Sequence, residues 1–184
     1  MIKFFITVLF IFYQCFAAES ILLKMDHRMS QVLQGSNQHL LLDFTMETIN
    51  LVSFPFEGMI SLQLSNSVAS KEKEAFLTTI ALIGITVGIL KYSVDRERPE
   101  RTYHPRLWNT RITPSFPSGH TAVSSGFATI LSSIYPEYSS HAVFYTLLSG
   151  YSQIYTGNHF ISDMLAGWLI GFTLGKIAYN STAL

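Results

Sequence analysis

Long apolar stretches separated by short polar segments fill the chain from residue 75 onward. The run from Phe76 to Leu90 is interrupted only by threonines and glycines. It predicts a helix over residues 75–94 that is either a membrane span or a buried core helix. Gly84 and Gly88 within it have the spacing that lets a second helix approach closely. Prolines, tyrosines and glycines bound three further apolar segments, which predict helices over 118–135, 140–155 and 160–179.

The preceding part of the chain has a more mixed pattern. A polar segment over 19–38 predicts a surface helix or arm, and apolar residues at helical spacing over 40–52 predict an amphipathic helix. Pro55 and Gly58 are expected to break that helix, so a separate short helix is expected over 59–64. No alternating pattern demands a sheet. The predicted fold class is therefore all-α, a helical bundle whose apolar helices suit either a membrane or a large soluble core.

The first residues resemble a secretory signal. Lys3 precedes an apolar run from Phe4 to Tyr13, and Cys15-Phe16-Ala17 offers small residues where a signal peptidase reads them. We predict a signal peptide over 1–17, with an uncleaved N-terminal anchor as the alternative. The expected organisation is then an N-terminal helical segment over 18–74 and a core over 75–184. The single cysteine would leave with the signal, which excludes a disulfide or a thiolate metal site in the mature chain.

Composition narrows the choice of partners. Twelve basic and twelve acidic residues give a formal net charge of zero, so no overall field attracts nucleic acid. Charged residues make up 13% of the chain, against about 25% in an average soluble domain. Nearly half of the residues are apolar. This balance suits either a helical protein in contact with a membrane or a soluble one with a large core, and any affinity for an anion must come from locally clustered charges.

Three small motifs can each carry chemistry, although each also has an ordinary structural interpretation. Residues 117–120 are Pro-Ser-Gly-His at the start of a predicted helix, where free backbone N–H groups suit an anion or Ser118 simply caps the helix. His159 and Asp163 lie four residues apart, so the carboxylate can orient the imidazole, or the pair can merely support a helix start. Lys91 and Arg98 lie seven residues apart, on one side of a continuous helix, and suit either phosphate or a membrane-side helix end.

Taken together and in order, these motifs resemble the type 2 phosphatidic acid phosphatase and vanadium haloperoxidase superfamily. The first family motif, Lys, six residues, Arg-Pro, corresponds to Lys91 through Arg98-Pro99, and the second is Pro-Ser-Gly-His at 117–120. The third, Ser-Arg, five residues, His, three residues, Asp, corresponds to Ser152-Gln153, His159 and Asp163. The resemblance covers about residues 75–178, and the first 74 residues match weakly or not at all.

The resemblance implies a helical bundle with its site where several helix ends meet. It implies that Lys91 and Arg98 bind phosphate oxygens, to which the Ser118 hydroxyl and the Gly119 N–H also donate. His120 would protonate the leaving alcohol. His159, oriented by Asp163, would attack phosphorus to give a phosphohistidine. Neither a metal nor another cofactor is implied, because positive side chains offset the charge on the phosphate oxygens.

One position departs from the family pattern. Gln153 stands where the third motif has arginine. Glutamine keeps a hydrogen-bond donor and loses the charge and the planar fork of arginine, so it is a phosphate-binding candidate in altered form. The missing charge could come from another arginine of the loop before the second motif: Arg101, Arg106 or Arg111.

The expected function is metal-independent hydrolysis of a phosphate monoester or pyrophosphate, in particular of a membrane lipid. The site is expected on the extracytoplasmic (periplasmic) side, with a phosphorylated lipid as its partner and with no nucleic acid and no evident obligate protein partner. The alternatives are a periplasmic acid phosphatase on small soluble esters, a vanadate haloperoxidase and a phosphate-binding relative without turnover. A zinc site from His120, His159 and Asp163 is disfavoured because nearby cations would repel a metal ion.

Overall fold

The computed structural model describes residues 21–67, 70–107, 111 and 113–182. The predicted signal segment over 1–17 lies outside these residues. Within the described part the fold is all-α, and no strand occurs. The helices are α2 (Ile21–Val32), α3 (Leu40–Ser67), α4 (Ser70–Val94), α5 (Gly119–Ile134), α6 (Ser139–Tyr155) and α7 (Ile161–Thr182), with a short 3-10 helix, η1 (Pro136–Tyr138), before α6.

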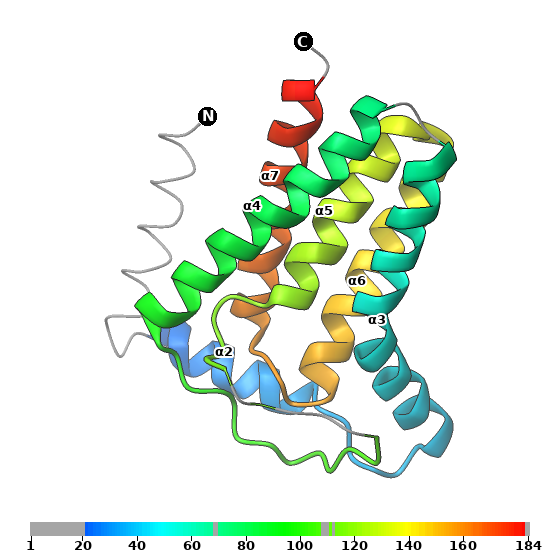
Figure 1. Ribbon diagram of the computed structural model, residues 1–184. Coiled ribbons are helices and arrows are strands. Elements are labelled where there is room, and N and C mark those ends of the chain that lie inside the picture. The colour runs from blue at the N-terminus through cyan, green and yellow to red at the C-terminus, as the bar shows by residue number, and fades with distance from the viewer. Residues whose placement is uncertain (1–20, 68–69, 108–110, 112, 183–184) are drawn as a thin grey trace.

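The helix α5 lies at the centre of the bundle and packs against α3, α4, α6 and α7. The end of α4, the start of α5, the end of α6 and the start of α7 all reach the same end of the bundle, the lower end in Figure 1. The short helix α2 lies across this end, and the loop segments over 95–107 and 113–118 run along it. The all-α prediction is confirmed, and residues from distant parts of the chain meet where the helix ends gather.

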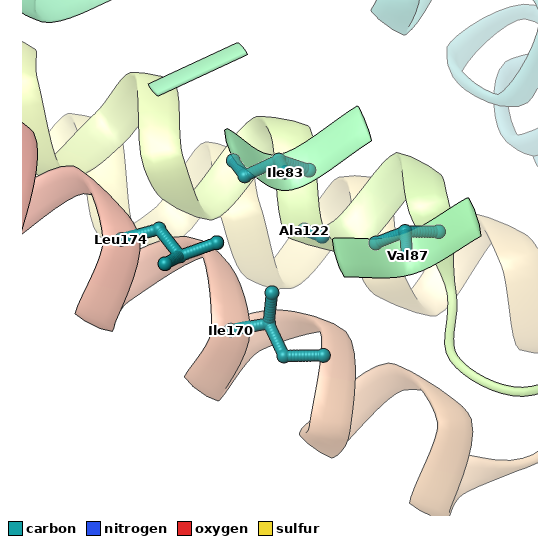
Figure 2. Packing of buried hydrophobic residues seen from close by; sticks show 5 residues of the cluster. All are labelled: Ile83, Val87, Ala122, Ile170 and Leu174. Carbon is teal, nitrogen blue, oxygen red and sulfur yellow. The ribbon is translucent and has the colours of Figure 1, made fainter. Parts of the chain in front are cut away.

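The core beside α5 consists of small and branched apolar side chains. Figure 2 shows Ile83 and Val87 of α4 and Ile170 and Leu174 of α7 meeting around Ala122 of α5. All five are at least nine-tenths buried. Small residues at the α5–α7 contact bring these two backbones close together, and this contact fixes the starts of α5 and α7 relative to each other.

Glycines of α7, rather than those of α4, permit the closest helix contact. A Cβ at Gly167 would collide with the carbonyl oxygen of Ser118, and one at Gly171 would collide with that of Ala122. No described atom lies within 4 Å of a Cβ built at Gly84 or Gly88. The prediction that the α4 glycines mark a close helix contact is therefore wrong.

The helix α3 runs through Pro55 and Gly58 without a break, so the predicted stop there is wrong. Tertiary contacts hold the backbone on both sides of the proline. Tyr145 of α6 donates a hydrogen bond to Glu57 at 2.9 Å and approaches the carbonyl of Ser53 at 3.5 Å. Such packing offsets the hydrogen bond that proline removes.

Within the part of the chain that the structure describes, two helices are long and apolar enough to cross a membrane: residues 71–94 and 161–182. Large apolar side chains on the outer face of α4 are more than half exposed, among them Leu77, Ile85 and Ile89. A soluble protein rarely leaves such a contiguous apolar face in water, whereas a bilayer covers it without cost.

Candidate active site

The turn between α6 and α7 positions His159. Gly157 has a φ of +67°, a conformation that favours glycine, and the turn then delivers His159 just before α7 begins. The backbone carbonyl of Gln153 accepts hydrogen bonds from the N–H groups of Asn158 and His159, at 2.9 and 3.2 Å. The imidazole is 3% exposed, and its Nδ1 lies 3.4 Å from Oδ2 of Asp163. The other ring nitrogen, Nε2, is left for a substrate.

The carboxylate of Asp163 is held by several donors besides His159. Arg96 donates to Oδ1 at 2.6 Å. Oδ2 accepts from the Ser115 hydroxyl and from the backbone N–H of Phe160, the latter at 3.0 Å. This completely buried carboxylate is therefore fixed in position before any ligand arrives.

Arg96 and Ser115 contact Asp163, and the motifs did not reveal either of them. Arg96 also donates to Asp26 of α2 at 2.8 Å and to the Ser162 hydroxyl at 2.8 Å, and it lies over the ring of Phe160. In the sequence, Arg96 could be noticed only through the charged run 95–98, and this run does not indicate which of its side chains is directed into the protein. A chain of contacts thus connects α2 with the carboxylate that orients His159.

The second motif forms the N-terminus of α5. The Ser118 hydroxyl caps this helix through Thr121, and the Ser118 N–H donates to the backbone carbonyl of Asp163 at 3.0 Å. Gly119 begins the helix and His120 follows in its first turn. The predicted helix start is confirmed, and this first turn of α5 lies at the same end of the bundle as the start of α7 (Figure 1).

Lys91 and Arg98 come together with the histidines, although not by the predicted route. α4 ends at Val94, so Arg98 lies in the loop rather than on a continuation of the helix. Lys91 donates to the carbonyl of Pro114 at 2.6 Å, and Arg98 donates to that of Asn158, the neighbour of His159, at 2.8 Å. His120 lies close enough for the charges of Lys91, Arg98 and His159 to act on it. The structure therefore gathers both basic residues and both histidines.

Burial shapes the protonation of the groups in the loops. Burial lowers the pKa of His159 to about 4, although Asp163 acts in the opposite direction. The imidazole is therefore neutral near pH 7, as a nucleophile requires. Burial and then the charge of Arg111 lower the pKa of Arg98 to about 10, which leaves its guanidinium charged.

Gln153 lies in a buried network of amides. Its Nε2 donates to Asn50 of α3 at 2.6 Å, and its Oε1 accepts from Asn158 at 3.3 Å. Asn158 also receives a hydrogen bond from Arg101 at 2.6 Å. Sequence reasoning missed Asn50 and Asn158. The side chain of Gln153 thus holds the turn that carries His159.

The three loop arginines have different surroundings. Arg106 lies 3.1 Å from the buried carboxylate of Asp43 and 3.8 Å from Glu47. Arg101 binds Asn158, and the charges of Arg98 and Arg111 act on it. Arg98 and Arg111 both line an open cleft of about 660 Å³. Arg106 therefore connects the loop to α3 through its ion pair with Asp43. Arg101 contacts the turn before His159, and Arg111 lines the cleft.

Among the described residues, no group of three or more histidine, cysteine, aspartate or glutamate side chains is arranged to hold a metal ion. His159 and Asp163 are instead surrounded by Lys91, Arg96 and Arg98. This donor set matches an anion rather than a cation.

The fold and the site define a helical protein with a cationic pocket at one end of its bundle. Residues 74–183 match the family model of the PAP2 superfamily, which is more than half of the chain. The chain belongs to the PAP2 superfamily.

Curated relatives and solved structures agree with this assignment. A lipid A 1-phosphatase of Porphyromonas gingivalis is 33% identical over 54% of this chain and 21% of its own length. A lipid A 1-phosphatase of Rhizobium etli is 24% identical over 63% of this chain and 56% of its own length. An undecaprenyl-diphosphatase of Sulfolobus acidocaldarius is 34% identical over 49% of this chain and 46% of its own length. The chain therefore spans between about a fifth and little more than half of these relatives.

Two solved structures share the fold. LpxE of Aquifex aeolicus superposes with a TM-score of 0.67 at 25% identity, covering 83% of this chain and 93% of that one. The transmembrane PAP2-type phosphatidylglycerolphosphate phosphatase of Bacillus subtilis gives a TM-score of 0.72 at 22% identity, covering 96% and 95%. Both neighbours share the all-α fold of this chain, in which the described helices α4 and α7 are long and apolar enough to cross a membrane.

Proposed function

We propose that the chain hydrolyses a phosphate monoester or pyrophosphate of a lipid, without a metal, through a phosphohistidine on His159. The observation that carries this proposal is the meeting of the His159–Asp163 pair with Lys91, Arg98 and His120 at one end of an apolar bundle. Membership of the PAP2 superfamily supports it. So do the names of the relatives, which describe phosphatases of lipid A and of undecaprenyl diphosphate.

In the proposed complex the phosphate lies between the α5 N-terminus and the basic residues. Lys91 and Arg98 offset the charge on its non-bridging oxygens, and the Ser118 hydroxyl and Gly119 N–H donate to the same oxygens. Lys91 and Arg98 now donate to backbone carbonyls, so a bound phosphate would take over donors that are already in place. Gln153 acts by holding the turn that carries His159.

The proposed reaction has two steps. Burial lowers the pKa of His120 to about 3 in the ligand-free chain, so His120 first takes the proton of the bound phosphate monoanion. Nε2 of His159 then attacks phosphorus, the bond from phosphorus to the leaving oxygen breaks, and this oxygen takes that proton from His120. His120, now neutral, then accepts a proton from water as the water oxygen attacks phosphorus and the phosphorus–nitrogen bond breaks. Inorganic phosphate leaves and the starting protonation state returns. Asp163 keeps Nδ1 of His159 as the donor and stabilises the charge that develops on the imidazole.

The test uses the purified full chain in detergent. Phosphate release is measured from phosphatidic acid, phosphatidylglycerophosphate, an isoprenyl diphosphate, lipid A and a soluble aryl phosphate. We expect release from at least one lipid, and an acid-labile phosphohistidine that His159→Ala abolishes and His141→Ala, at an exposed histidine, retains. No release from any of these compounds would contradict the proposal.

Two of the other functions are separated by simple measurements. A vanadate haloperoxidase would oxidise halide when vanadate and peroxide are added, whereas we expect vanadate only to inhibit. A phosphatase of small soluble esters would remain in the supernatant after cell fractionation and would prefer the aryl phosphate. The exposed apolar face of α4 favours the membrane fraction.

We further propose that the site faces the extracytoplasmic, periplasmic side, as the secretory pattern of the first residues suggests. Glu97 is exposed at the site end of the bundle and provides a reporter position. A Glu97→Cys variant in a Cys15→Ser background should react with a membrane-impermeant thiol reagent in intact cells. Labelling only after lysis of the cells would place the site on the cytoplasmic side.

A further inference from the structure

Gln153 carries no positive charge that could bind a phosphate, and its side chain already forms hydrogen bonds within the protein. Both functional groups of the Gln153 amide have partners, on Asn50 and on Asn158, and the residue is 1% exposed. A guanidinium from this position of α6 is therefore missing from the site. If phosphate is held by more than Lys91 and Arg98, the additional cation must come from another element.

Most other arginines near the site already have acidic or amide partners. Arg96 pairs with Asp163 and Asp26, and Arg106 pairs with Asp43. Arg101 donates to the side-chain oxygen of Asn158. Each of these contacts fixes a part of the protein that carries or supports the site.

Arg111 differs from these arginines because the hydrogen bond given for it within the described residues goes to a backbone carbonyl and not to an acidic or amide side chain. One of its terminal nitrogens donates to the carbonyl of Pro99 at 2.5 Å, which fixes the side chain next to Arg98. Its Nε is buried and has no hydrogen-bond partner. None of the ion pairs formed within the described ranges includes Arg111. A partly buried guanidinium that has no carboxylate partner among the described residues and lies at a cleft is suited to an anion from outside the chain.

Arg111 also has the right location. It lines the same open cleft as Arg98 and Thr113, and Thr113 accepts two hydrogen bonds from Arg98. Its charge acts on both Arg98 and Arg101. Arg98 in turn touches the residue next to His159. A phosphate that Arg98 binds would thus lie on the side of the cleft that Arg111 faces.

We infer that Arg111 binds the substrate phosphate beside Arg98 and replaces the arginine that the family pattern has at position 153. This inference rests on the proposed function for its substrate, a phosphorylated lipid. It assigns the phosphate grip to three cations from two elements: Lys91 from α4, and Arg98 and Arg111 from the loop before α5. Arg101 then acts as a positioning residue, through Asn158, for the turn that carries His159.

The test compares Arg111→Gln and Arg111→Lys with Arg28→Gln, at an exposed arginine of α2, in the purified full chain. Phosphate release from phosphatidic acid and the inhibition constant of orthovanadate, a phosphate analogue, are measured for each. Loss of one donor to a phosphoryl transition state lowers the rate by about 10²-fold. We expect Arg111→Gln to lower kcat/KM by about that factor and to weaken vanadate inhibition by about tenfold. Arg111→Lys should recover part of both losses, and Arg28→Gln should leave both unchanged.

Two outcomes would overturn the inference. The first is an Arg111→Gln variant that retains the kcat/KM and the vanadate inhibition of the Arg28→Gln control. The second is a loss of activity that Arg111→Lys does not reduce and that leaves vanadate inhibition intact, since this would show a purely structural role. The unfolding midpoint of each variant shows whether it remains folded.

Direct titration with orthovanadate separates this inference from the proposed function. If the wild-type chain releases no phosphate from any lipid but binds vanadate, and Arg111→Gln abolishes that binding, the proposed function fails while the assignment of Arg111 stands. If the wild-type chain binds no vanadate, both fail. If it turns over lipid phosphate equally well with and without Arg111, only the assignment of Arg111 fails.

Discussion

Replacing Arg96 with methionine removes the cation that lies against the buried carboxylate of Asp163. The two side chains are 8% and 0% exposed and lie 2.6 Å apart. Removal of one partner from a buried pair costs about 3–5 kcal/mol, because the other charge stays buried. Asp163 keeps the donors Ser115 and the Phe160 N–H, so we expect the lower end, about 3 kcal/mol of unfolding free energy.

The cause can be isolated with a double-mutant cycle. Arg96→Met, Asp163→Asn and the double variant are unfolded by denaturant in detergent. If the pair itself carries the effect, the double variant should lose about 2 kcal/mol less than the sum of the single losses. A sum that is additive within about 0.5 kcal/mol would refute the reasoning.

The same variant also has a kinetic consequence. Asp163 orients His159, and Arg96 fixes Asp163, so Arg96→Met should lower kcat more than it raises KM. We expect about a tenfold decrease in kcat, because the remaining donors keep the carboxylate near its place. Asp26→Asn, which removes the more distant partner of Arg96, should have a smaller effect on kcat. An equal effect of the two variants would contradict this order.

Three further outcomes follow from the packing and the charges. The pKa of His159 is about 4 in the folded chain and about 6.5 in the unfolded chain. Its contribution to the free energy of unfolding is therefore complete above pH 6.5 and is lost as the pH falls toward 4. Denaturant titrations should show that wild type loses stability over this range more steeply than His159→Ala. Gly171→Ala should destabilise the chain by more than about 2 kcal/mol, because its Cβ collides with backbone, whereas Gly84→Ala should be neutral or stabilising by up to about 1 kcal/mol; equal melting temperatures would contradict this. Asn50→Leu should cost about 1–3 kcal/mol in unfolding free energy, because it leaves a buried amide without its partner, and unchanged stability would contradict the amide network.

Local patterns predicted the helices of the core closely because apolar stretches, prolines and glycines act within one element. The helix expected over 118–135 is α5, Gly119–Ile134, and the one over 140–155 is α6, Ser139–Tyr155. Pro55 shows the limit of this reasoning, because contacts from α6 sustain a helix that local propensity would end. The glycine pair of α4 shows another limit, since spacing says nothing of which face meets a neighbour.

The motif residues could be found from sequence, but their supports could not. The contact of Arg96 with Asp26 joins residues 70 positions apart, and that of Gln153 with Asn50 joins residues 103 positions apart. No rule of sequence spacing relates residues so far apart in the chain. A charged run or a single asparagine also occurs often in proteins without any role in a site. The catalytic roles of His159 and His120 stay predictions, because the structure gives their proximity and not their reactivity.

The substitution at position 153 can be understood from the electrostatics of an empty site. Lys91, Arg98 and Arg111 already share one end of the bundle, where the charge of Arg98 opposes that of Lys91 and the charge of Arg111 opposes that of Arg98. A further arginine at position 153 would add to this repulsion whenever phosphate is absent. A neutral glutamine avoids the additional charge and joins Asn50 and Asn158 in a network that needs no counter-ion. A phosphate-binding cation from the loop therefore agrees with a neutral residue at position 153 of α6. We expect Gln153→Arg to lower the melting temperature of the ligand-free chain more than that of the vanadate complex.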